Sequence, residues 1–124
     1  MSAHSMHSEP LIVERAFPEA GQGVLVLKGP LTASNLHSFQ NAIRRENTPT
    51  LILDLTEVPY VDSSGLGSLV SAYVSGHKGG QQVVLTGVND RVSKLLEITR
   101  LEPLFLIFPT LDAALEALSN SGQA

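Results

Sequence analysis

Residues 51–70 read LILDLTEVPYVDSSGLGSLV, and this stretch contains the transition that decides the fold. Residues 50–55 are nearly continuous in apolar character, which is typical of a strand covered on both faces of its sheet. After Asp62 the apolar residues recur at helical spacing. The predicted buried stripe of this helix occupies positions i, i+3, i+4, i+7, i+8 and i+11, which are Leu66, Leu69, Val70, Tyr73, Val74 and His77. Gly79 and Gly80 are predicted to end the helix.

The start of this helix carries the most informative residues of the chain. Asp62 is the predicted N-cap, whose carboxylate accepts a hydrogen bond from the backbone N–H of Ser64 or Gly65. Ser63 is then the first helical residue, at a helix end where several backbone N–H groups lack helical partners. Gly65 and Gly67 each cost about 1 kcal/mol of helix propensity, so their presence in the first turn indicates that another surface comes close. Ser68 is predicted to lie on the exposed side.

Strands and helices alternate outward from this stretch. Further strands are predicted at residues 11–15, 23–29, 82–86 and 104–108, and the first two form an antiparallel hairpin because their connection is short. Three more helices follow predicted capping residues: Leu36, Phe39 and Ile43 after Thr32; Val92, Leu95 and Leu96 after Asn89; and Ala114, Leu115 and Leu118 after Thr110. This order predicts a single α/β domain with a mixed, mostly parallel five-stranded sheet and about four helices.

Composition excludes several classes of protein. The chain has 124 residues, 43% of them hydrophobic, which suits one globular domain at residues 10–118 with flexible tails at 1–9 and 119–124. It has no cysteine, so disulfides, thiolate zinc sites and cysteine nucleophiles are excluded. A net charge of -4 argues against nucleic acid as a partner. The longest apolar run is far shorter than the roughly 20 residues of a membrane span, so a cytoplasmic protein is expected. No bound metal or cofactor is expected either. His4 and His7 are interpreted as tail residues rather than a metal site.

The motif Asp62-Ser63-Ser64-Gly65-Leu66-Gly67 after an apolar strand resembles the phosphorylation motif of anti-sigma factor antagonists, which are single-domain STAS proteins. The order of elements also matches from about residue 11 to residue 118. The flanking segments Leu27-Lys28-Gly29, Leu53-Asp54-Leu55 and Leu95-Leu96-Glu97-Ile98-Thr99-Arg100-Leu101 agree with the family pattern. The resemblance therefore implies a bacterial STAS fold and a regulatory role.

What the resemblance implies is a partner switch without catalytic activity in this chain. The unmodified antagonist binds an anti-sigma factor that is also a serine kinase of the GHKL type, and this frees the sigma factor. The kinase phosphorylates the motif serine, the antagonist is released, and a PP2C-type phosphatase resets it. Carried over to this sequence, the phosphoacceptor is Ser63, with Ser64 as the second candidate. The implied partner surface comprises Asp62, Ser63, Ser64, Gly65, Gly67, Ser68, Pro30, Leu31 and Thr32.

One segment departs from the family pattern. Members often have Gly-Glu-Leu-Asp after the second strand, whereas this chain has Gly29-Pro30-Leu31-Thr32. Both acidic residues are missing from a loop that the family uses for partner contact. The identity of the partner is therefore open, while the fold is expected to tolerate the change because Thr32 still caps the following helix.

Three other interpretations compete with the switch. The motif can be a helix cap and nothing else, because Asp and Ser are favoured at helix starts. A nucleotide-binding enzyme is disfavoured, since Gly65-Leu66-Gly67 lacks the third glycine of a dinucleotide fingerprint and the chain has no P-loop. His37 and His77 have no partners in sequence that suggest a catalytic triad. Finally, the chain can be a STAS interaction module of another complex, such as a lipid-transport accessory subunit, that is not switched by phosphate.

Overall fold

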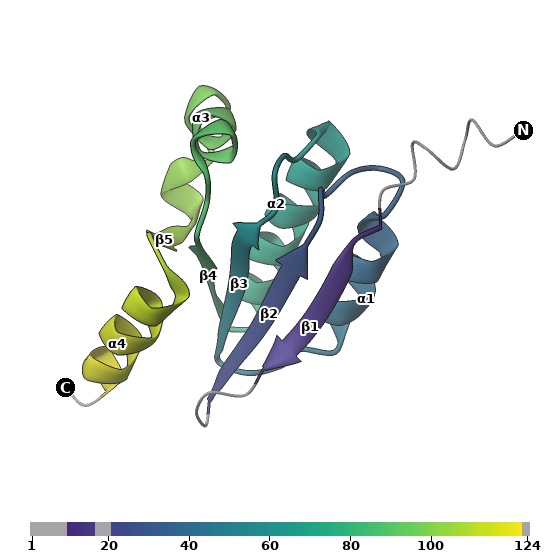
Figure 1. Cartoon of the computed structure of the whole chain (residues 1–124). Helices are drawn as coiled ribbons and strands as arrows, with labels where there is room; N and C mark the ends of the chain where they lie inside the picture. Colours follow the sequence, from purple (N-terminus) through teal and green to yellow (C-terminus); the bar gives the residue numbers. More distant parts are fainter. Residues whose placement is uncertain (1–9, 17–20, 123–124) are drawn as a thin grey trace, which may run out of the picture.

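Five strands form one sheet in the order β1-β2-β3-β4-β5, with helices on both faces (Figure 1). The computed structural model describes residues 10–16 and 21–122. Its elements are β1 (Ile12–Ala16), β2 (Gln22–Lys28), α1 (Leu36–Arg44), β3 (Thr50–Glu57), α2 (Ser63–Lys78), β4 (Gln82–Thr86), α3 (Asp90–Ile98), a short 3-10 helix (Glu102–Leu104), β5 (Leu106–Phe108) and α4 (Leu111–Gly122). The predicted α/β architecture with a mixed sheet and four α-helices is confirmed.

The pairing of the strands follows from the connections between them. β1 and β2 are antiparallel, with Glu14 opposite Val26, so the predicted hairpin pairing at the edge of the sheet is confirmed. β2, β3, β4 and β5 are mutually parallel, and each successive pair is joined through a helix. Because parallel strands need such crossovers, the carboxyl ends of β2, β3 and β4 meet at one edge of the sheet, where α2 and α3 begin.

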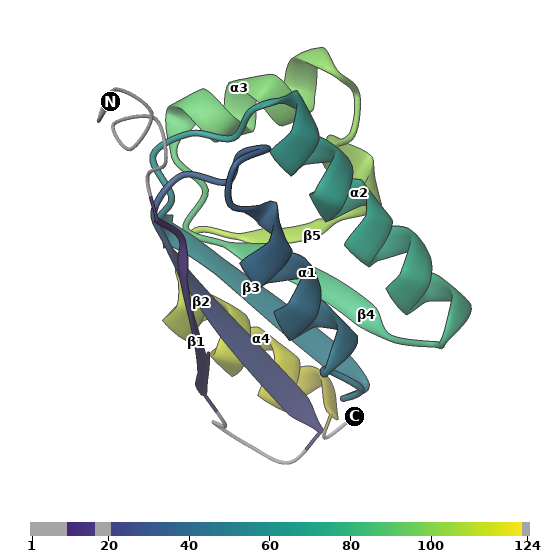
Figure 2. The same ribbon diagram turned by 90° about the vertical axis from the view of Figure 1, so that its right-hand side faces the viewer.

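The apolar residues of β3 divide between two cores. Leu51, Leu53 and Leu55 are buried with residues of α1, α2 and α3, whereas Ile52 is buried with Ala114 of α4. Figure 2 shows α1 and α2 side by side on one face of the sheet and α4 behind it. The prediction that this strand is covered on both faces is therefore confirmed, and its nearly continuous apolar run is explained.

The first helix begins later than the sequence predicts. Its N-cap is Asn35, not Thr32, and α1 starts at Leu36. The side chain of Asn35 accepts a hydrogen bond from the Thr32 N–H at 3.0 Å and donates to the Pro30 carbonyl at 2.8 Å. These bonds form a turn over residues 30–35 that precedes the helix, so Thr32 belongs to the turn and the prediction that it caps the helix is wrong.

The buried face of α2 also differs from the predicted stripe. Asp62 caps the helix and Gly79 ends it, as predicted. The buried residues are Gly65, Leu66, Ser68, Leu69, Ala72 and Gly76. Val74 is 43% exposed and His77 is exposed, so these two do not belong to the core. A Cβ at Gly76 would lie 3.1 Å from the Val83 side chain, which indicates that small residues let α2 lie close to β4 and turn a narrower face toward the sheet.

The last elements are shifted relative to the predicted ones. Leu104 ends the 3-10 helix, and β5 begins only at Leu106. Thr110 caps α4 by accepting from the Ala113 N–H at 3.0 Å, as predicted, but α4 continues to Gly122 rather than ending near Leu118. The predicted N-terminal tail, with His4 and His7, lies outside the described residues. No helix in the described part of the chain has the length and apolar character needed to cross a membrane.

Candidate functional site

The candidate site lies at the edge of the sheet where β2 and β3 end. The loop after β2 and the loop after β3 run side by side, because Leu31 and Val61 form an isolated parallel bridge. Leu31 N–H donates to the Tyr60 carbonyl at 3.2 Å, and Asp62 N–H donates to the Leu31 carbonyl at 3.1 Å. These bonds place the N-terminus of α2 next to the turn over residues 30–35.

Asp62 joins the two loops through both carboxylate oxygens. Oδ1 accepts from the Gly65 N–H at 2.8 Å, which confirms the predicted cap. Oδ2 accepts from the Ala33 N–H at 3.1 Å, a contact across 29 positions of sequence that the sequence did not predict. Since both oxygens are used, Asp62 fixes the start of α2 and the preceding turn relative to one another.

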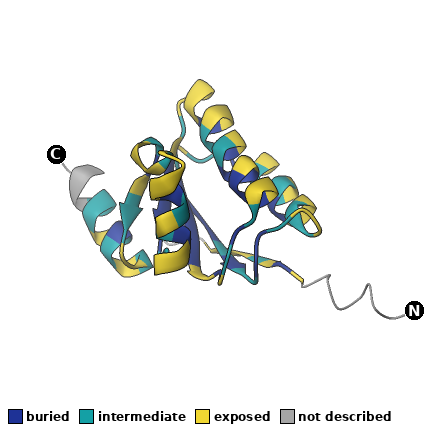
Figure 3. Cartoon of the chain, turned by 90° about the horizontal axis from the view of Figure 1, so that it is seen from above, coloured by how far each residue is buried: buried dark blue, intermediate teal, exposed yellow. Residues whose placement is uncertain are grey.

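Ser63 and Ser64 are the exposed residues of this helix start. Ser63 is the first residue of α2, immediately after the cap, and both serines are exposed. Figure 3 colours the chain by burial and shows exposed and buried residues alternating along the helices. The motif therefore presents two hydroxyls to solvent at the positive end of the helix dipole.

The two glycines of the motif have different roles. A Cβ on Gly65 would lie 2.1 Å from the Leu31 carbonyl oxygen and 2.9 Å from the Val61 side chain. A Cβ on Gly67 would meet nothing within 4 Å, and this residue is exposed. The surface that approaches Gly65 thus belongs to the chain's own loop, whereas Gly67 leaves free space on the outside of the helix.

Several predicted partner residues are buried. Ser68 is 6% exposed and its hydroxyl donates to the Gly65 carbonyl at 2.7 Å, so the prediction that it lies on the exposed side of α2 is wrong. Pro30 is buried and Leu31 is 0% exposed, because both close the core below the loop. Thr32 is half-buried.

The exposed residues of the loop are Ala33 and Ser34, which the sequence did not single out. The hydroxyls of Ser34 and Thr32 lie 2.9 Å apart within the turn. Ala33 and Ser34 both belong to the turn over residues 30–35, whereas a helix capped at Thr32 would have included them.

The start of α3 supports the other side of the loop between β3 and α2. Asn89 caps α3 by accepting from the Val92 N–H at 2.8 Å, as predicted, and its Nδ2 donates to the Pro59 carbonyl at 3.0 Å. The Arg91 guanidinium lies 5.1 Å above the centre of the Tyr60 ring, which is a cation–π contact. The sequence predicted the cap but not these contacts with the loop.

The buried acidic residue of β3 that precedes the motif, Asp54, is bonded within the chain. Asp54 is buried within β3, and its Oδ1 accepts from the hydroxyls of Thr56 at 2.7 Å and Thr86 at 3.0 Å. In the part of the chain that the structure describes, no three His, Cys, Asp or Glu residues are grouped as metal ligands would be. The exposed hydroxyls of Ser63 and Ser64 at a capped helix start favour a docking and modification surface.

Asp62→Ala is expected to lower the free energy of unfolding by about 1–2 kcal/mol, because it removes the helix cap together with the bond to Ala33. Asp62→Asn is the matched control, since an asparagine oxygen caps a helix about as well as a carboxylate. Urea denaturation of both variants measures the difference. Equal stability of Asp62→Ala and the unaltered chain would contradict the structural role given to this carboxylate.

Comparisons with known proteins agree on one family. The family model described as STAS domain matches residues 16–114. A curated relative, the anti-sigma-B factor antagonist of Listeria monocytogenes, is 46% identical over 57 residues, which are 46% of this chain. The match spans half the length of that relative.

Two solved structures are similar over most of the chain. An anti-sigma factor antagonist from Mycobacterium paratuberculosis is 26% identical with a TM-score of 0.72, covering 86% of this chain and 92% of that one. The STAS domain of a SulP transporter from Vibrio cholerae is 29% identical with a TM-score of 0.71, covering 87% of this chain and 88% of that one. The fold is thus shared by regulators and by a transporter domain.

Proposed function

The chain belongs to the STAS domain family, and on this premise we propose that it is an anti-sigma factor antagonist controlled by phosphorylation of Ser63. Unmodified, it binds an anti-sigma factor that is also a GHKL-type serine kinase. Phosphorylation of Ser63 ends the binding, and a PP2C-type phosphatase restores it. The proposal assigns the chain no catalytic activity and no cofactor. The chain is a cytoplasmic binding protein whose phosphorylation state is set by its partners.

The observation that carries this proposal is the exposed Ser63 at a rigidly held helix start. Asp62 is bonded on both carboxylate oxygens, and the backbone of Leu31 is bonded to Tyr60 and Asp62 of the loop after β3. A kinase therefore meets the hydroxyl in a fixed place. The relative that is 46% identical over 57 residues supports the proposal, because it is named as an antagonist of an anti-sigma factor.

The fold is expected to survive the modification. A phosphate adds about -1.5 to -2 charges at neutral pH, and a helix N-terminus stabilises negative charge by roughly 0.3–1 kcal/mol. The neighbouring Asp62 carboxylate opposes this, so the net effect on stability is small. Ser63 is exposed, so a phosphate on its hydroxyl can extend into solvent.

The effect on binding is expected to be large. A partner that covers the start of α2 would have to bury an unpaired dianion, which costs several kcal/mol. A loss of about 3 kcal/mol already lowers the affinity by more than about a hundredfold. Phosphate therefore cancels the interaction at the surface while the domain stays folded.

Gly67→Trp is expected to abolish partner binding while leaving the thermal melting temperature nearly unchanged. The space outside Gly67 is empty in the free protein, so an indole there clashes with the partner and not with the chain itself. The measurement is binding of the anti-sigma factor by isothermal calorimetry, with Gly67→Ala as the control of minimal size. Unchanged affinity of Gly67→Trp would place the partner surface elsewhere.

An unswitched STAS interaction module is the second candidate function, and the similarity to the transporter domain from Vibrio cholerae favours it. Affinity purification of the chain from its native cell, followed by mass spectrometry, separates the two. A GHKL-type kinase among the bound proteins supports the antagonist. Membrane transport subunits in its place support the module.

A further inference from the structure

Charge is unevenly distributed between the helices of this acidic chain. The sequence has 12 acidic and 8 basic residues, yet α1 and α2 contain no Asp or Glu. By contrast, α4 carries Asp112 and Glu116. The layer formed by α1 and α2 therefore presents cationic side chains, Arg44, Arg45 and Lys78, on a protein whose net charge is -4.

The only acidic residues close to this layer in sequence are already occupied. Asp62 accepts two backbone hydrogen bonds at the start of α2. Glu46, which follows α1, has a fully buried carboxylate that forms an ion pair with Arg15 of β1. Neither carboxylate is free to neutralise the cations of α1.

A groove runs between α1 and α2 on this face. Two adjoining hollows of about 210 and 460 Å³ form it, and they share Ile43, Arg44, Ala72 and Ser75 as lining residues. Its apolar floor includes Phe39 and Ala72, both buried. Along α2 the groove extends from Ser68 to Gly79, which is about 16 Å or three helical turns. This α1–α2 groove begins one residue beyond Gly67.

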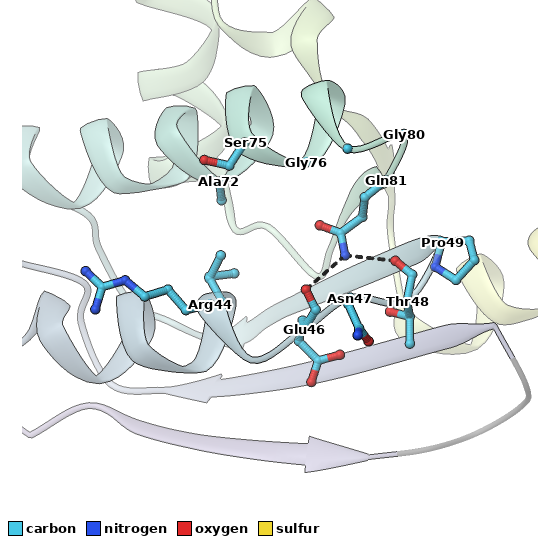
Figure 4. A pocket seen from close by; sticks show the side chains of 12 residues that line it. Arg44, Glu46, Asn47, Thr48, Pro49, Ala72, Ser75, Gly76, Gly80 and Gln81 are labelled. Atoms are coloured by element: carbon cyan, nitrogen blue, oxygen red, sulfur yellow. Dashed lines mark hydrogen bonds between the residues drawn. The ribbon is translucent and has the colours of Figure 1, made fainter.

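Arg44 lies where the two hollows of the α1–α2 groove adjoin. It lines both hollows, and Figure 4 shows it on the α1 side, across from Ser75 on α2. Its guanidinium donates to Asn41 at 3.3 Å, within the same helix. Among the described residues, the ion pairs are Arg15–Glu46 and Lys28–Glu14, and neither involves Arg44. The groove thus combines an apolar floor with a cation that lacks a carboxylate partner in the described chain.

We propose that the α1–α2 groove receives an acidic amphipathic helix of the anti-sigma factor, with a carboxylate of that helix paired to Arg44. This rests on the proposed function, because Ser71 and Ser75, which line the groove, follow Gly67 at four-residue spacing on the same side of α2. An amphipathic helix lays its apolar face into such a groove, and the exposed serines on the α2 rim, Ser71 and Ser75, are small enough to let it approach closely. Charge complementarity with Arg44 fixes its register and orientation.

The proposal also accounts for the loop that departs from the family pattern. The loop of this chain is neutral at Pro30, Leu31 and Thr32, where relatives often place two acidic residues. A partner matched to those acidic residues would offer cations. In this chain the exposed charged residues of α1 and α2, Arg44 and Lys78, are basic, so the matching surface for the groove is acidic.

The test measures the affinity of the purified anti-sigma factor for single variants, each paired with a neighbouring control. Arg44→Glu is expected to weaken binding by about tenfold or more, whereas Arg45→Glu changes it by less than about twofold, because Arg45 is exposed but does not line the groove. Ser75→Trp fills the groove and is expected to weaken binding similarly. Its control is Val74→Trp, which places the same side chain on the exposed surface outside the groove. Thermal melts verify that all four variants fold.

A charge swap decides whether the pair is direct. Replacing one acidic residue of the partner helix by Lys is expected to restore most of the binding lost in Arg44→Glu. Equal losses for Arg44→Glu and Arg45→Glu would overturn the proposal in favour of general electrostatic attraction. Self-association of the unaltered chain that Ser75→Trp abolishes, seen by sedimentation, would overturn it in favour of a second copy in the groove.

Failure of this proposal is distinguishable from failure of the proposed function. If Gly67→Trp abolishes binding while Arg44→Glu and Ser75→Trp bind normally, the groove is empty in the complex and the antagonist function stands. If the unaltered chain binds no anti-sigma factor, both the function and the groove assignment are overturned.

Discussion

Gly65→Ala is expected to lower the free energy of unfolding by about 2–3 kcal/mol, the largest loss of stability for a single methyl group at this site. The added Cβ would lie 2.1 Å from the Leu31 carbonyl oxygen, a backbone atom that accepts a hydrogen bond from Asp62 N–H. Relief of the clash requires that α2 move away from the loop. The same movement breaks the bridge between Leu31 and Val61.

Gly67→Ala provides the matched control two residues away in the same helix. A Cβ there meets nothing within 4 Å, and alanine has a higher helix propensity than glycine by about 1 kcal/mol. Its stability is therefore expected to be equal to or above that of the unaltered chain. Urea unfolding of both variants checks the contrast. Equal destabilisation by the two alanines would contradict the distinct roles given to these glycines.

Phosphorylation of Ser63 is expected to lower the affinity for the anti-sigma factor by more than about a hundredfold. The reason is that the partner must cover a charge that water solvates in the free protein. The expected comparison is between the phosphorylated and unmodified chain in the same binding assay, with thermal melts of both. A large drop in the melting temperature on phosphorylation would contradict the switch, because the proposed mechanism requires that the fold be unaffected.

Substitutions of Ser63 distinguish the effect of an added charge from the effect of losing the hydroxyl. Ser63→Ala is expected to fold, resist phosphorylation and bind constitutively, because only a hydroxyl is lost. Ser63→Asp is expected to bind more weakly than the unaltered chain but more tightly than the phosphorylated chain, since aspartate carries only one charge. Ser64→Ala, the neighbouring control, is expected to remain phosphorylated on Ser63 and to bind before that modification.

Local patterns in the sequence were sufficient for the order of elements and for the cap at Asp62. The run at residues 50–55 and the residues Asp62, Asn89 and Thr110 act through contacts within a few positions of sequence, so their roles were visible without a structure. The pairing of the strands followed from the alternation of strands and helices.

Long-range contacts account for what the sequence did not predict. Thr32 was misplaced because the side chain of Asn35 organises a turn that uses it. The exposure of Val74 and the burial of Ser68 depend on how closely α2 approaches the sheet, which small residues such as Gly76 allow. Helical periodicity favours large apolar residues and overlooks such small ones. The second bond of Asp62, to Ala33, joins segments 29 positions apart and has no local signal.

The most direct test of the account is to map the phosphate after incubation of the chain with its anti-sigma factor kinase and ATP. Tandem mass spectrometry is expected to find one phosphate, on Ser63, in the unaltered chain and in Ser64→Ala, and none in Ser63→Ala. Phosphate on Ser64 alone would move the site by one residue and keep the mechanism. Phosphate on neither serine, with a kinase shown to bind, would contradict the switch and leave the Asp62 motif as a helix cap and docking turn of an unswitched binding module.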